Sequence, residues 1–121
     1  DRREYETAEF ELMWMLENDV HEILEPVTRM RLALVLVEQD RAEEGLQMLS
    51  VDIELGAHVV SWHETQGDIH YQMGDNSSAR AAYQTAVDLL GEDDSAKPML
   101  MAKLQDLTVA PSAEEATQVA E

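Results

Sequence analysis

Residues 67–86, GDIHYQMGDNSSARAAYQTA, decide the fold, because they combine a turn with small residues at positions where two helices can cross. The pair Gly74-Asp75 forms the turn between two amphipathic runs. Helices that cross closely need a small residue on each side and a large one to fill the space beside them. We expect Gly67 and Ala79 to be the small pair and Tyr83 to be the filler. The stretch therefore predicts a helical hairpin.

A second copy of this pattern precedes the first. Residues 31–49, RLALVLVEQDRAEEGLQML, match residues 65–83, TQGDIHYQMGDNSSARAAY. The aligned pairs are Ala33 with Gly67, Leu36 with His70, Gly45 with Ala79, and Leu49 with Tyr83. The offset, 67 − 33 = 34 residues, is the period of the tetratricopeptide repeat (TPR). The first copy departs at Asp52, where the second has the small residue Ala86.

This periodicity predicts an all-α fold of TPR-like helical-hairpin repeats, an α-solenoid, with a C-terminal capping helix. We expect one domain over residues 1–109 and a flexible tail over residues 110–121. Within the domain, residues 1–19 form the second helix of an incomplete repeat, residues 26–51 and 57–90 form two repeats, and residues 98–108 form the cap. The helices of the two repeats are expected at residues 26–39, 42–51, 58–73 and 77–90. Asn76 or Ser77 should cap the last of these, and Gly91 should end it in a left-handed conformation.

The charge balance limits the partners. Twenty-six acidic and 8 basic residues give a formal net charge of −18. Such a surface repels nucleic-acid phosphates and anionic lipid, so we expect neither nucleic acid nor direct membrane contact by this chain. The longest apolar run, residues 32–37, is far shorter than the roughly 20 residues of a membrane span. There is no cysteine for a disulfide or a thiolate metal site.

No motif indicates catalysis, a cofactor or a metal. His63 and His70 lie seven residues apart and lack the i, i+4 spacing of zinc helices, so we expect structural histidines. The glutamates lie on outer helix faces, and Ser77-Ser78 has no base in register. We therefore expect a protein that is not an enzyme.

The candidate binding residues lie on the first helix of each hairpin, which lines the concave groove of a TPR stack. Counted from Ala33 and Gly67, they are Val27, Met30, Leu34, Val37, Glu38, Ser61, Glu64, Asp68, Tyr71 and Gln72. Such a groove is apolar at one end and acidic, with one tyrosine, at the other, which suits an amphipathic or unfolded segment. In the alternative interpretation, earlier repeats or the helix at residues 2–18 cover residues 27–37.

The helix at residues 2–18 has an unusually broad apolar face, formed by Phe10, Leu12, Met13, Trp14, Met15 and Leu16. As the second half of an incomplete repeat, it lacks its natural partner helix. We therefore expect self-association through this helix, as a homodimer.

Four segments carry a more specific pattern than the general repeat: residues 31–49, Gly67-Asp68, GDNSSARAAYQTAV at residues 74–87, and PMLMAKLQDLTV at residues 98–109. Through them, residues 26–109 resemble the C-terminal part of the ancillary SecYEG translocon subunit family, whose members are membrane-anchored bacterial TPR proteins. The last segment is the most distinctive, because general TPR proteins do not share this ending. Trp62 and His63 depart from the pattern of the family.

The resemblance implies a location on the periplasmic side of the inner membrane, with an anchor and earlier repeats outside this chain. It also implies protein partners, namely translocon subunits, periplasmic chaperones or secreted chains. The expected function is a scaffold of the secretion apparatus. The alternatives are a generic TPR adaptor for peptide tails and a self-associating structural module without a dedicated ligand.

Overall fold

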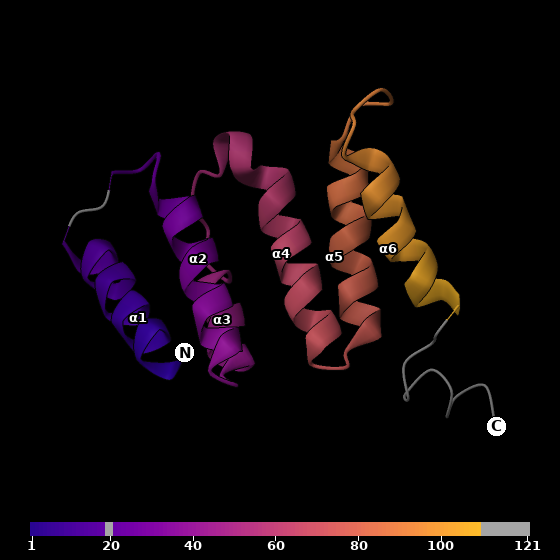
Figure 1. Cartoon of the computed structure of the whole chain (residues 1–121). Coiled ribbons are helices and arrows are strands. Elements are labelled where there is room, and N and C mark those ends of the chain that lie inside the picture. The colour runs from indigo at the N-terminus through magenta and orange to yellow at the C-terminus, as the bar shows by residue number, and fades with distance from the viewer. Residues whose placement is uncertain (19–20, 110–121) are drawn as a thin grey trace. The chain divides into compact units, whose positions relative to one another are not determined.

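The computed structural model describes residues 1–18 and 21–109, and within these ranges it contains helices and no strand (Figure 1). The elements are α1 (Arg2–Glu17), α2 (Glu25–Glu38), α3 (Ala42–Met48), the short 3₁₀ helix η1 (Gly56–His58), α4 (Val59–Gln72), α5 (Asn76–Leu89) and α6 (Lys97–Val109). The predicted all-α fold is thus confirmed. The chain divides into two compact units, Asp1–Trp62 and His63–Glu121, with the boundary inside α4. The predicted tail, residues 110–121, lies outside the described residues.

In the first unit, α2 and α3 form a hairpin whose backbones touch at Gly45. A Cβ atom at Gly45 would lie 2.8 Å from the carbonyl oxygen of Ala33, closer than real Cβ contacts come. Ala33 is fully buried, and Leu32, Leu36 and Leu49 pack into the core. The predicted small pair therefore lies at the crossing.

In the second unit, α4 and α5 form the equivalent hairpin. Here the ring of Tyr83 occupies the space that a side chain at Gly67 would need. A Cβ atom at Gly67 would lie 2.5 Å from the nearest ring carbon of Tyr83. Ala79 and Ala86 are fully buried beside this ring on α5. α6 packs against α5 and buries Leu100 and Leu107.

The two hairpin turns have the same backbone design, 34 residues apart. Asp40 and Gly74 both adopt positive φ, 59° and 82°, which lets the chain leave one helix and enter the next. The matching hydrogen bonds run from Arg41 N–H to Leu36 C=O and from Asp75 N–H to His70 C=O, both 2.9 Å. These turns support the repeat period that the sequence predicts.

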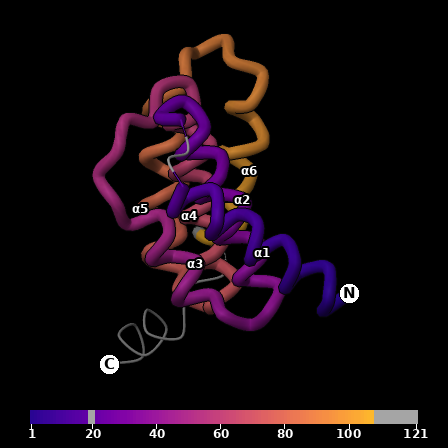
Figure 2. The backbone as a smooth tube through the Cα atoms, turned by 90° about the vertical axis from the view of Figure 1, so that its left-hand side faces the viewer, coloured from indigo at the N-terminus to yellow at the C-terminus, as the bar shows by residue number. Residues whose placement is uncertain are grey.

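α1 packs against α2, and its N-terminal half lies beside the turn between α2 and α3 (Figure 2). A capping box begins α1: the Asp1 carboxylate accepts hydrogen bonds from the backbone N–H groups of Arg3 and Glu4, and the Glu4 side chain accepts from the N-terminus. Since α1 and α3 both pack on α2, this helix is covered on more than one side, and it buries Met30, Leu32, Ala33 and Leu36.

The second helix of the first hairpin, α3, is shorter than predicted: it ends at Met48 and not at Val51. The Arg29 guanidinium of α2 donates to the Met48 carbonyl at 3.1 Å, and the Ser50 hydroxyl donates to the Leu46 carbonyl at 2.7 Å. These side chains satisfy carbonyl groups that a longer helix would have used.

Two predictions about the ends of α5 were wrong. Its N-cap is Asp75, whose carboxylate accepts from Ser78 N–H at 3.1 Å, and not Asn76 or Ser77. At the other end, α5 finishes at Leu89, and Leu90 follows in an extended conformation, with φ −85° and ψ 146°. Gly91 is not left-handed. An extended exit needs no residue with positive φ, so glycine is not required there.

The contact at Gly45 gives the first test. We expect Gly45→Ala to destabilise the chain by about 1–2 kcal/mol, because the new methyl group meets a backbone carbonyl that cannot rotate away. This is the net effect: overpacking costs about 2–3 kcal/mol, and the gain in helix propensity from glycine to alanine, about 1 kcal/mol, offsets part of it. Urea unfolding followed by circular dichroism measures the difference. Gly91→Ala is the control, because a Cβ atom there meets nothing within 4 Å. A Gly45→Ala variant as stable as the wild type would contradict the close crossing.

Candidate functional site

The predicted groove residues on α2 differ in their accessibility. Met30 is buried, with 7% of its surface exposed, and belongs to the core. Val27 and Val37 are half-buried. Leu34, at 47%, and Glu38 are exposed. A ligand on this face of α2 would therefore reach Leu34 and Glu38 first.

The predicted groove residues on α4 are more polar and more accessible. Ser61 and Gln72 are exposed, and Tyr71 exposes 56% of its surface. Glu64 and Asp68 are half-buried. The structure brings the last two together around a residue that sequence analysis did not select.

This residue is Lys103 of α6. Its ammonium group donates to Glu64 Oε2 at 2.8 Å and to Asp68 Oδ1 at 2.9 Å, and lies 5.4 Å from the centre of the Tyr83 ring. The Tyr83 hydroxyl also donates to Asp68 Oδ1. Side chains of α4, α5 and α6 thus meet in one polar cluster, Glu64–Asp68–Tyr83–Lys103.

The cluster shifts the proton affinities of its members. Burial, and then the hydrogen bond to Asp68, raise the pKa of Tyr83 well above its ordinary value, so the phenol stays neutral. Burial alone would lower the pKa of Lys103, but the hydrogen bonds to Glu64 and Asp68 outweigh it and raise the pKa. The lysine therefore stays charged, and it neutralises part of the acidity predicted for this end of the groove.

A cavity of about 290 Å³ adjoins the cluster in the second unit. It is lined by Asp68, Tyr71, Tyr83, Lys103 and Asp106. Two aromatic rings, two carboxylates and one ammonium group make it amphipathic. Asp68 and Tyr71, two of the predicted groove residues, thus border a cavity.

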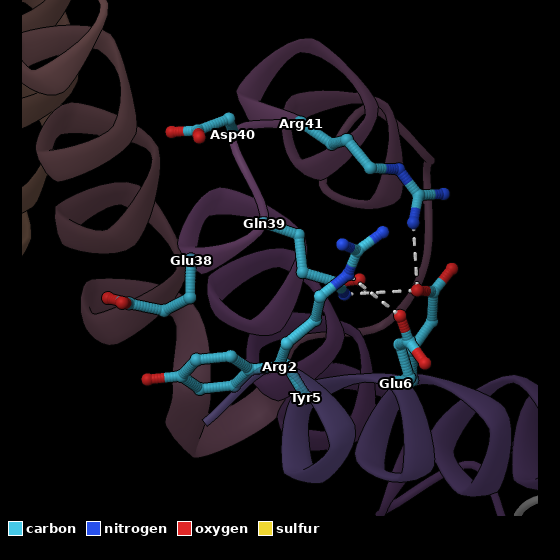
Figure 3. Close-up of a pocket in the computed structure, with 8 residues that line it drawn as sticks. Arg2, Tyr5, Glu6, Glu38, Gln39, Asp40 and Arg41 are labelled. Carbon is cyan, nitrogen blue, oxygen red and sulfur yellow. Dashed lines mark hydrogen bonds and ion pairs between the residues drawn. The ribbon is translucent and has the colours of Figure 1, made fainter.

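A larger cavity, of about 650 Å³, lies in the first unit between α1 and the turn that follows α2 (Figure 3). Its lining residues are Arg2, Tyr5, Glu6, Glu9, Glu38, Gln39, Asp40 and Arg41. Glu9 of α1 accepts from Gln39 Nε2 at 3.0 Å and from Arg41 Nη1 at 2.8 Å. Hydrogen bonds to Glu44, and then to Glu9, raise the pKa of Arg41, while Arg41 lowers the pKa of Glu44. These contacts tie α1 to the hairpin.

Only part of the apolar face expected on α1 is exposed: Leu12, Met13, Met15 and Leu16 are half-buried, whereas Phe10 and Trp14 are exposed among polar residues. Phe10 exposes 72% of its surface and Trp14 exposes 57%, and α1 has no fully buried residue. α1 covers part of α2 with one side and leaves these two rings accessible on the other.

The histidines take part in local contacts. His63 Nδ1 lies 3.0 Å from Gln66 Oε1, and His70 Nδ1 lies 3.9 Å from Asp75 Oδ2. Among residues 1–18 and 21–109, no group of three or more His, Cys, Asp and Glu residues has the arrangement of a metal site. Over the same residues, no helix has both the length and the apolar character that crossing a bilayer requires.

Lys103 was missed because its partners lie 35 and 39 residues away in sequence. The sequence nevertheless contained a signal for this contact. Lys103 is the one charged residue in the otherwise apolar segment 98–104, and it belongs to the distinctive segment 98–109. A lysine that follows a run of apolar residues in a helix is a candidate for a partly buried ion pair.

Comparison with known proteins agrees with the repeat pattern. A family model described as a tetratricopeptide repeat-like domain matches residues 1–109. An ancillary SecYEG translocon subunit of Neisseria gonorrhoeae (strain ATCC 700825 / FA 1090) is 26% identical over 107 residues, which cover 88% of this chain and 51% of the relative. The chain thus spans about half the length of this relative. No solved structure gives a significant match. The family resemblance inferred from the sequence is confirmed.

The polar cluster gives a prediction about pH. Both raised pKa values belong to groups that ordinarily titrate at 10.0 and 10.5, so the folded chain holds these protons more tightly than the unfolded chain. Their contribution to stability is therefore complete at neutral pH and is lost as the pH rises above about 10. We expect Tyr83→Phe to cost about 1–2 kcal/mol at neutral pH and to make the alkaline loss shallower.

Urea unfolding at a series of pH values measures this effect. The control is the same series at high salt, which screens the general repulsion of the −18 net charge. Parallel curves for wild type and Tyr83→Phe above pH 10 would contradict the role of the phenol.

Proposed function

Because the chain belongs to the tetratricopeptide repeat-like domain family, we propose that it is a non-catalytic scaffold that binds segments of other proteins on α2 and α4. The observation that supports this most directly is the exposure of Leu34 and Tyr71, at 47% and 56%. Each belongs to a helix fixed by a close hairpin contact. A rigid helix with accessible large side chains binds a segment at a small entropic cost.

We further propose that these partners belong to the Sec secretion apparatus and to its periplasmic chaperones. The support is the similarity to an ancillary SecYEG translocon subunit over 88% of this chain. The proposed location is the periplasmic side of the bacterial inner membrane. The candidate partners are translocon subunits, periplasmic chaperones and secreted chains.

A generic adaptor for acidic peptide tails fits less well. Such an adaptor needs unpaired cations in the groove to hold a carboxylate. Here Lys103, the basic residue that lines the cavity of the second unit, already donates to two carboxylates. An anionic tail would have to compete with Glu64 and Asp68.

A binding experiment tests the proposed surface. Purified SecYEG in nanodiscs, and separately a permanently unfolded model chain, are titrated with the protein while biolayer interferometry records binding. Leu34→Asp should weaken binding by about 1–3 kcal/mol, because it places a charge in an apolar contact. The control variant is Leu89→Asp, which introduces the same charge at a leucine of α5 that is 49% exposed and should leave binding nearly unchanged.

Equal weakening by both variants would contradict the assignment to α2. No binding of either probe by the wild type would overturn the proposed scaffold function. Circular dichroism of each variant confirms that it is folded.

A second candidate function is self-association through α1, and the exposure of Phe10 and Trp14 is what favours it. Two aromatic rings one helical turn apart form an apolar stripe that a second α1 can match. The net charge of −18 on each copy opposes this dimer, so salt should strengthen it.

Light scattering coupled to size exclusion tests the dimer. We expect a mass that rises with concentration and with salt, and a monomeric mass for Trp14→Glu, because the new carboxylate is placed in the apolar stripe. Met99→Glu is the control, since Met99 is 66% exposed but lies on α6. A wild type that stays monomeric at high concentration and high salt would exclude this candidate.

A further inference from the structure

We propose that the cavity of the second unit binds a lysine or arginine side chain of the docked partner, so that the partner is a basic segment. The cavity is the one lined by Asp68, Tyr71, Tyr83, Lys103 and Asp106. This inference rests on the proposed scaffold function and specifies the chemistry of its ligand.

The shape and lining of the cavity suit a long cationic side chain. Its volume, about 290 Å³, exceeds that of one lysine or arginine side chain. Tyr83 is buried, with 3% of its surface exposed, whereas Tyr71 exposes 56%. The aliphatic stem of a lysine can lie against the exposed Tyr71 ring while its ammonium group reaches the carboxylates.

The charge of the cavity favours a cation even though it contains a lysine. Glu64, Asp68 and Asp106 contribute three negative charges around it and Lys103 contributes one positive charge, which leaves a local charge of about −2 with carboxylates ionised at neutral pH. Tyr83 and Lys103 both donate to Oδ1 of Asp68, and neither uses its Oδ2. Asp106 is exposed. An incoming ammonium or guanidinium group thus finds carboxylate oxygens to accept its hydrogen bonds.

The chain itself shows how such a site holds a cation. Lys103 lies 5.4 Å from the centre of the Tyr83 ring and donates to two carboxylates, Glu64 and Asp68. Tyr71, with Asp106 beside the same cavity, offers a second aromatic ring and carboxylate of the same kinds. The recognition proposed for the partner therefore repeats, between molecules, a contact that already exists within the second unit.

The charge of the whole chain supports the same partner. With 26 acidic and 8 basic residues, its field attracts basic segments and raises their association rate. The general field acts at a distance, whereas the cavity supplies the fixed position for one cationic group. The experiment must separate these two effects.

The probes are two fluorescein-labelled amphipathic peptides of the same sequence, one with lysines along one edge and one with glutamines in their place. Fluorescence anisotropy records their binding to the full chain. We expect the lysine peptide to bind at least about five-fold more tightly, as one close charge contact near a protein surface provides. Asp106→Asn should weaken the lysine peptide by about three- to ten-fold and leave the glutamine peptide nearly unchanged. Tyr71→Ala should weaken both peptides, and the lysine peptide more, because Tyr71 also belongs to the proposed docking surface.

Two further variants make the test specific. Lys103→Met should strengthen binding of the lysine peptide, because it removes the positive charge from the cavity. Asp93→Asn makes the same change of net charge as Asp106→Asn at an exposed residue outside the lining of the cavity, and should have little effect.

Equal effects of Asp93→Asn and Asp106→Asn would overturn the proposal, because only the general field would then act. Equal affinity for the two peptides would also overturn it while leaving the scaffold function intact. If the wild type binds neither peptide, and also fails to bind SecYEG and the unfolded model chain, the result would instead count against the scaffold function itself.

Discussion

The absence of a side chain at two glycines is the constraint on which the rest of the structure depends. At Gly45 the missing Cβ lets α3 reach the carbonyl of Ala33, and at Gly67 it leaves room for the Tyr83 ring. Close packing of this kind fixes the register of each hairpin, because sliding one helix by a residue would bring a side chain into the gap. Rigid hairpins then hold Leu34 and Tyr71 at accessible positions.

Tyr83 links this packing to the polar chemistry of the second unit. Its ring fills the space beside Gly67, and its hydroxyl reaches Asp68, which also accepts from Lys103. The ammonium group of α6 is therefore held by α4 carboxylates that the hairpin itself positions. The same atoms border the cavity, so the contact that fixes the C-terminal helix also determines the charge offered to a ligand. The proposed recognition site thus shares residues with the packing of the second unit.

Sequence reasoning succeeded where the determinants are local or periodic. The small residues Ala33 and Gly45 meet at the first crossing, Gly67 leaves room for Tyr83 in the second hairpin, and the 34-residue offset recurs in the turns at Asp40 and Gly74. It failed where a side chain far away in sequence decides. Arg29 satisfies the end of α3 from 19 residues away, and Lys103 reaches Asp68 across 35 residues. No periodicity encodes such pairs, and they appear only once the helices are placed.

The two units offer different chemistry to a partner, and this difference narrows the class of ligand. The first unit presents an exposed leucine on α2, and the second presents an exposed tyrosine beside carboxylates on α4 and α6. Taken one unit at a time, the first suits an apolar side chain of a ligand and the second suits a basic one. A purely apolar segment would use only α2, and an acidic one would be repelled from α4. Under the proposed scaffold function, the chemistry of the two units therefore favours amphipathic, positively charged segments that bind through modest contacts.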